Sequence, residues 1–165
     1  MKIAYVVAEN LSKEHGVSKK IYNQIKFWTE SKHEVKLFYF SNKPLNSMFK
    51  EIEHTVINYK SRINFVLGNK SIIPIEDWQP DIIYFRSYLF TNTFNTMAKK
   101  FPTIMEINSD DEQQNKIHMP YFARYFDKLT RKKLIKNAAG FVCVTKELEK
   151  NILYIIFQLL LFLME

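Results

Sequence analysis

Residues 80–110 read PDIIYFRSYLFTNTFNTMAKKFPTIMEINSD and contain two apolar segments on either side of a helical pattern. Asp81 to Phe85 is a mostly apolar and β-branched run, typical of a strand buried on both faces of a parallel sheet. Thr91 to Lys100 has apolar residues at helical spacing, and Pro102 ends that helix before Thr103 to Ile107 returns to a strand pattern. The stretch therefore predicts one β-α-β unit.

Polar residues follow both strands of this predicted unit. Arg86 and Ser87 come after the first strand, and Asn108, Ser109 and Asp110 come after the second. Ligands of open parallel sheets bind beyond the carboxyl ends of the strands. We therefore expect these five residues to face one crevice.

The same alternation continues on both sides of the unit. Further strands are predicted at Lys2 to Ala8, Val35 to Phe40 and Gly140 to Val144, with a short one at Thr55 to Ile57. A helix is predicted to begin at Gly16, and its buried face consists of Val17, Ile21, Ile25 and Trp28. A short helix at Ile63 to Leu67 and another capped by Thr145 complete the pattern. The fold class is α/β, with a doubly wound, mostly parallel sheet and helices on both faces.

The composition indicates one folded domain. The chain has 165 residues, of which 47% are hydrophobic and 25% are charged, with only 3 Gly and 5 Pro. We expect a Rossmann-like domain at 1–150, and at 151–165 an apolar C-terminal helix or a truncation tail. The single Cys143 and the absence of a signal peptide at Met1 suit the cytoplasm.

Known cofactor motifs are absent. The sequence has no G-x-G-x-x-G after a strand, no P-loop, and no histidines at metal-ligand spacing. We predict no cofactor and no metal. His15 lies beside Gly16 at the crevice, where it is a candidate to reach a substrate hydroxyl, and the start of that helix is a candidate anion site.

Two interpretations remain open for the acidic residues after the second strand. Asp110 or Glu112 accepts hydrogen bonds from substrate hydroxyls, or acts as a general base. Alternatively, these carboxylates form a solvated run that caps a helix.

A basic helix is predicted from Tyr121 to Asn137, in a chain whose formal net charge is +7. Its cations either rest on an anionic membrane surface or form a solvated helix face. Nucleic acid is disfavoured, because the aromatic residues lie at helical spacing on the apolar face and are not interleaved with the cations. The cations are Arg124, Lys128, Arg131, Lys132, Lys133 and Lys136.

The end of the chain is apolar on all sides. From Ile152 to Met164 only Tyr154 and Gln158 interrupt the apolar run. An apolar helix must be covered. We expect a chain that is cut short here, or a tail that docks on a membrane or another subunit.

Several phrases resemble one family in the same order. MKIAYVVAEN, HGVSKKIYNQIKFW, HEVKLFYF, QPDIIYFRS, FPTIMEINSD and NAAGFVCVTKELEK are similar to the amino-terminal domain of family-four (group one) GT-B glycosyltransferases. The resemblance covers Met1 to Lys150. It implies a retaining sugar transferase of two doubly wound domains, in which the second, absent here, holds most of the nucleotide-sugar donor.

The resemblance implies an acceptor-binding half that transfers sugar poorly or not at all by itself, and a sugar acceptor that is lipid-linked or a polysaccharide. It places the Gly16 turn near the donor phosphates and Asp110 near the reacting centre, as the catalytic residue. Asn108 stands where many relatives have a histidine, and Gly16 where many have two glycines. The predicted substrate-binding residues are His15, Gly16, Val17, Ser18, Arg86, Ser87, Asn108, Ser109 and Glu112.

Relatives are often basic and peripheral to membranes, which implies a cytoplasmic protein at the inner face of the membrane. Two other functions compete with the transferase half. The first is a non-catalytic, membrane-associated binding module whose apolar tail anchors it. The second is a subunit that completes a transferase with a separately encoded donor-binding chain.

Overall fold

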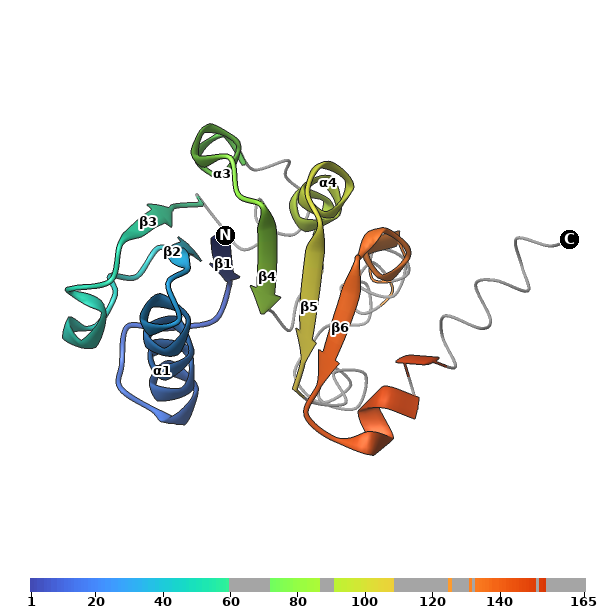
Figure 1. Ribbon diagram of the computed structural model, residues 1–165, viewed down its shortest axis with the longest axis horizontal. Coiled ribbons are helices and arrows are strands. Elements are labelled where there is room, and N and C mark those ends of the chain that lie inside the picture. The colour runs from blue at the N-terminus through green and yellow to red at the C-terminus, as the bar shows by residue number, and fades with distance from the viewer. Residues whose placement is uncertain are drawn as a thin grey trace, which may run out of the picture.

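A parallel sheet forms the centre of the protein (Figure 1). The structure, a computed structural model, describes residues 1–59, 72–86, 91–108, 125, 131, 133–150 and 152–153. Within these residues the sheet has six strands in the order β3-β2-β1-β4-β5-β6, and every neighbouring pair is parallel. The strands are β1 (Lys2–Val7), β2 (Glu34–Phe40), β3 (His54–Ile57), β4 (Ile82–Arg86), β5 (Thr103–Ile107) and β6 (Gly140–Cys143).

Helices cover both faces of this sheet. On one face lies α1 (Gly16–Glu30), whose Ile21 and Ile25 are buried against Tyr5 and its neighbours on β1 and β2. On the other face lie α3 (Ile73–Trp78) and α4 (Asn92–Lys100), where Phe94 and Phe85 have ring centroids 4.4 Å apart. A 3-10 turn, η1 (Ser47–Phe49), lies between β2 and β3. The fold is the doubly wound α/β architecture that the sequence predicts, and the strand order reverses between the parallel neighbours β1 and β4.

The β-α-β unit predicted from residues 80–110 is confirmed. Strand β4 lies one residue later than predicted, and β5 has the predicted bounds. Helix α4 begins after Thr91, whose side chain accepts a hydrogen bond from the Phe94 N–H and so satisfies a free donor of the first turn. Thr145 caps the helical residues 146–150 in the same way, through the N–H of the buried Leu148.

The segment between β2 and β4 was only partly predicted. Strand β3 is present one residue longer than expected, whereas η1 and α3 were not predicted. The predicted helix at 63–67 lies outside the described residues. Trp78 packs edge-on against Phe38 with 5.8 Å between ring centroids, so it serves as a packing aromatic.

The predicted basic helix needs one correction. Residues 133–137 are helical, and Lys133 and Lys136 are exposed. Arg131, however, is only 9% exposed, so its place among the surface cations is wrong. Residues 131, 134 and 135 share one helix face, and the fully buried Leu134 and Ile135 turn that face toward the core. The other three cations, at 124, 128 and 132, lie outside the described residues.

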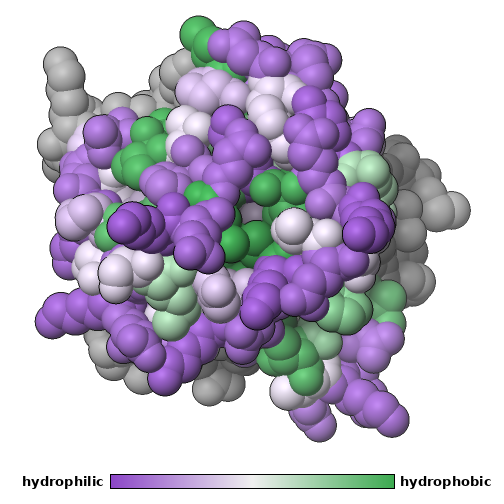
Figure 2. All heavy atoms as spheres, turned by 60° about the vertical axis from the view of Figure 1, so that its left-hand side comes forward, coloured by the Kyte–Doolittle hydropathy of each residue, from purple (hydrophilic) through white to green (hydrophobic). Residues whose placement is uncertain are grey.

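The surface over α1 and β3 is largely hydrophilic, with apolar groups visible between polar ones (Figure 2). Phe27 on α1 and Val56 on β3 are among its exposed large apolar residues. None of the helices in the described part of the chain is both long and apolar enough to cross a membrane. Ile152, from the apolar end, is 9% exposed and belongs to the core beside Leu148.

Candidate functional site

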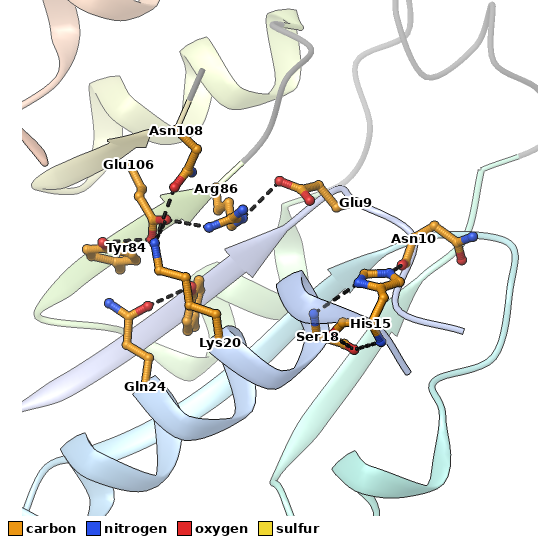
Figure 3. Close-up of polar contacts among 11 residues, drawn as sticks. Glu9, Asn10, His15, Ser18, Lys20, Gln24, Tyr84, Arg86, Glu106 and Asn108 are labelled. Carbon is orange, nitrogen blue, oxygen red and sulfur yellow. Dashed lines mark hydrogen bonds and ion pairs between the residues drawn. The ribbon is translucent and has the colours of Figure 1, made fainter. Parts of the chain in front are cut away.

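A network of charged and polar side chains lies at the carboxyl ends of β1, β4 and β5 (Figure 3). This edge includes the point where the strand order reverses, which is where open α/β sheets bind ligands. We call this set the switch-point network. Its members come from the loop after β1, from α1, from β4 and from β5 with the residue that follows it: Glu9, Lys20, Tyr84, Arg86, Glu106 and Asn108.

Arg86 is the buried cation of the network. Its Nε donates to Glu9 Oε1 at 2.9 Å, and its Nη1 donates to Glu106 Oε1. Only 6% of its side chain is exposed. A guanidinium presents donors in a fixed planar fork, which allows one side chain to bridge two carboxylates. In this structure the charge predicted to bind substrate is therefore neutralised within the protein.

Glu106 is the buried anion at the centre of the network. Its Oε1 accepts a hydrogen bond from Lys20 Nζ at 2.7 Å in addition to that from Arg86, and its Oε2 accepts one from the Tyr84 hydroxyl at 2.9 Å. Burial raises the pKa of this carboxyl, but the Lys20 hydrogen bond and the Arg86 charge outweigh burial, so the pKa lies below its ordinary value. Glu106 is therefore ionised at neutral pH.

Aromatic side chains pack against one another next to these charges. The rings of Tyr5 and Tyr84 meet edge to face at 5.2 Å, and Trp28 packs on both. Burial raises the pKa of both tyrosine hydroxyls above the ordinary value of 10.0, and the nearby negative charge of Glu106 raises both further. The two hydroxyls therefore stay protonated and act as hydrogen-bond donors, with that of Tyr5 donating to Gln24 at 2.9 Å.

His15 and Ser18 close the start of α1 by a reciprocal cap. The ring Nδ1 of His15 accepts from the Ser18 N–H at 3.2 Å, and the Ser18 hydroxyl oxygen accepts from the His15 N–H at 2.8 Å. The ring Nε2 lies 2.8 Å from the carbonyl oxygen of Asn10. A backbone N–H can only donate and a carbonyl can only accept, so the ring is neutral with its proton on Nε2. Both ring nitrogens of His15 are therefore used within the protein.

The structure brings only some of the predicted site residues together. Arg86 and Asn108 are joined through Glu106 and Lys20, whereas the His15 cap lies separately at the start of α1 (Figure 3). Gly16 is exposed and Val17 is half-buried at the same helix start. Ser87, Ser109, Asp110 and Glu112 lie outside the described residues. The roles predicted for all of these residues stay predictions.

Four network residues were missed by sequence reasoning: Glu9, Lys20, Tyr84 and Glu106. Glu106 had a usable signal, because a carboxylate inside an otherwise apolar strand needs a partner when it is buried. Lys20 had none, since it meets Glu106 across 86 residues of sequence. Glu9, in the loop after β1, likewise had no local feature that separated it from a solvated residue. The described residues contain no group of three or more His, Cys, Asp and Glu side chains placed to hold a metal ion.

No protein-family model and no curated protein sequence matches the chain. Solved structures do match, and two of them are glycosyltransferases. A lipopolysaccharide outer core galactosyltransferase, WaaB, in its apo form is 17% identical with a TM-score of 0.64, over 94% of this chain and 42% of that one. An alpha-glucosyltransferase in complex with UDP and a 13-mer DNA is 14% identical with a TM-score of 0.56, over 87% of this chain and 37% of that one.

The shared fold defines the class of this domain. It is a Rossmann-like α/β domain, and it shares this fold with part of each of the two glycosyltransferases. The chain spans less than half the length of either solved structure. At these identities the likeness establishes the fold, and function needs a separate argument.

Proposed function

We propose that this chain is the acceptor-binding part of a retaining, nucleotide-sugar-dependent glycosyltransferase of family four. The observation that carries the proposal is the switch-point network, a set of polar side chains at the ligand-binding edge of a sheet whose fold is shared with two glycosyltransferases. A nearly neutral, hydrogen-bonding edge suits a polyhydroxylated ligand better than a strongly charged one. In the network two carboxylates face two cations.

The predicted site residues receive distinct roles in this proposal. Asn108 is half-buried at the end of β5 and contacts a ligand hydroxyl, while Asp110, two residues further on, accepts the proton of the acceptor hydroxyl as general base. Ser87, Ser109 and Glu112 contribute further hydrogen bonds. The helix start at Gly16 and Val17 offers backbone N–H groups to the donor phosphates, and His15 with Ser18 holds that turn in shape.

The proposed reaction is sugar transfer, and a binding screen is needed to identify the acceptor. One of the two similar structures is a lipopolysaccharide outer core galactosyltransferase and the other is an alpha-glucosyltransferase in complex with DNA, so the shared fold accompanies different partners. We propose a saccharide acceptor, lipid-linked or part of a polysaccharide. Donor binding is expected to require a second domain or chain, because the present sequence matches about two fifths of those transferases.

Nuclear magnetic resonance of the full chain tests the proposal directly. A panel of methyl glycosides is titrated into ¹⁵N-labelled protein, with UDP-glucose, UDP-galactose and GDP-mannose in parallel. We expect a sugar to shift the amide resonances around Lys20, Glu106 and Asn108, with weaker effects from the nucleotide-sugars. If no glycoside moves these resonances at millimolar concentration, the chain is not an acceptor-binding part. Tight nucleotide-sugar binding without glycoside binding would instead assign this domain to the donor side.

We further propose that the domain associates peripherally with anionic membranes at the cytoplasmic face. Lys133 and Lys136 are exposed on the same short helix, and the chain carries a formal net charge of +7. Flotation with vesicles that contain an anionic lipid is expected to carry the wild type and to lose Lys133→Glu/Lys136→Glu. Equal flotation of the two proteins would exclude this helix as the contact surface. Flotation without glycoside binding would favour a non-catalytic membrane module.

A further inference from the structure

We infer that Lys20 is a positioning residue, which fixes the carboxamide of Asn108 so that its amino group is free to donate to a hydroxyl of a bound sugar. The inference rests on the proposed function, because it concerns the same crevice. It adds a residue from α1 that no feature of the sequence assigned. The residues that carry it are Lys20, Glu106 and Asn108.

The first step is the orientation of the amide. Lys20 Nζ lies 3.2 Å from Asn108 Oδ1. An ammonium group has three donors and no acceptor, so the atom that faces it must be the amide oxygen. The Nδ2 group of Asn108 is then directed away from Lys20. One contact thus removes the ambiguity between two amide orientations that differ by a half turn.

The second step is the rigidity of the anchor. The ammonium that holds Asn108 is itself held at 2.7 Å by Glu106, whose side chain is 1% exposed. Glu106 in turn accepts hydrogen bonds from Arg86 and Tyr84, both of which are buried. The flexible lysine side chain therefore ends on a buried carboxylate that two further side chains hold in place. A continuous series of hydrogen bonds therefore connects the core to the half-buried Asn108 at the ligand-binding edge.

The third step is the chemistry at the exposed end. The side chain of Lys20 is 45% exposed, so the pair lies where the core meets solvent. A positive charge on the amide oxygen polarises the carboxamide and strengthens its N–H groups as donors. An oriented, polarised N–H pair matches the acceptor oxygens of a sugar hydroxyl. Preorganisation of this kind lowers the cost of ordering the side chain when the ligand binds.

The first experiment uses the ligand-free full chain. Three-bond couplings and the separation of the two Nδ2 proton resonances report the rotamer and orientation of Asn108. We expect one orientation in wild type and in Lys20→Arg, which keeps the charge and the donors, and averaging in Lys20→Met. Lys19→Met is the matched control, since Lys19 is 59% exposed and pairs with the exposed Glu14 at 3.0 Å. An unchanged Asn108 in Lys20→Met would overturn the inference.

The second experiment adds methyl α-D-glucopyranoside or methyl α-D-galactopyranoside, whichever shifts the wild-type amides more. We expect Lys20→Met to weaken binding about tenfold, the scale of one well-formed hydrogen bond, and Lys20→Arg to restore most of it. Equal binding in wild type and Lys20→Met would overturn the inference while leaving the proposed function intact. Failure of both sugars to bind wild type would count against the proposed function, whereas the ligand-free couplings would still test Lys20.

The same series of variants is also checked for correct folding. Thermal unfolding is recorded for every variant, and Lys20→Gln replaces Lys20→Met if the latter does not fold. Asn108→Asp provides an independent check, because its carboxylate still accepts from Lys20 but lacks the amino group. We expect this variant to fold and to lose sugar binding. Wild-type affinity in Asn108→Asp would overturn the inference.

Discussion

Arg86 and Glu106 stand side by side in the register of β4 and β5, and their buried side chains form an ion pair on the face of the sheet that carries α1. Neither residue is more than 6% exposed at its side chain. Ions buried in this way lose their hydration, and the pair is tolerated because Glu9, Lys20 and Tyr84 supply the remaining contacts. The buried side chains beneath the candidate site thus depend on one another for their hydrogen bonds and ion pairs.

Removal of Arg86 should therefore be costly. In Arg86→Met the carboxylates of Glu9 and Glu106 lose the cation between them, and the buried Glu106 keeps only Lys20 and Tyr84. We expect the free energy of unfolding to fall by about 3–5 kcal/mol, the usual cost of removing one partner of a buried ion pair. Urea unfolding at pH 7 measures the change.

A double variant separates the effect of losing the ion pair from the effect of losing each side chain's packing. Arg86→Met with Glu106→Gln removes both charges, and we expect a total loss of stability well below the sum of the two single losses. Strict additivity would show that the two side chains do not depend on each other. The exposed pair of Lys19 and Glu14 serves as the comparison, because surface ion pairs contribute about 0–1 kcal/mol.

The stability of the protein should fall in acid partly because of Glu106. Its pKa in the folded protein lies below the ordinary value of 4.5, so the folded state favours the ionised form. The stabilising contribution is complete above about pH 4.5 and is lost as the pH falls through the lower folded value. In Glu106→Gln that part of the pH dependence is absent. The gap between the unfolding temperatures of wild type and variant should narrow from pH 6 to pH 3, whereas a constant gap would contradict the prediction.

The two buried tyrosine hydroxyls should contribute different amounts to the free energy of unfolding. Tyr84 donates to the charged Glu106, whereas Tyr5 donates to the neutral Gln24. Hydrogen bonds to charged groups contribute about 1.5–3 kcal/mol and neutral ones about 0.5–1.5 kcal/mol. We expect Tyr84→Phe to destabilise the protein more than Tyr5→Phe in parallel urea unfolding curves. The reverse order would mean that the Tyr84 hydroxyl is not needed by Glu106.

His15 should act as a helix cap in stability measurements. His15→Ala removes the acceptor for the Ser18 N–H, at an expected cost of about 0.5–2 kcal/mol. His15→Asn supplies a strong capping side chain and should recover most of this loss. If His15 instead contacts ligand, both substitutions weaken glycoside binding equally while His15→Asn remains stable. Measuring stability and binding on the same two variants distinguishes these roles.

Local pattern predicted most of the secondary structure that frames the site. The apolar runs of β1, β4 and β5 identified strands buried on both faces, and Thr91 with Pro102 bounded α4. These signals are local, because strand and helix periodicity and capping chemistry act over a few residues. Helix α3 was missed, since its six residues are too few to show a period. Arg131 was misplaced because its helix face is decided by contacts with the core.

The sequence by itself determined an α/β domain with a parallel sheet, and it placed Arg86 and Asn108 at one edge of that sheet. Only the tertiary structure decided what those residues do there. The parallel crossovers bring Glu9, Lys20, Arg86 and Glu106 together from four separate elements, with 86 residues between Lys20 and Glu106. The sequence does not show which charged residues will pair, because electrostatic pairing depends on distance in space and on burial. The network therefore exists only in the folded protein, where burial of Glu106 makes each of its partners necessary.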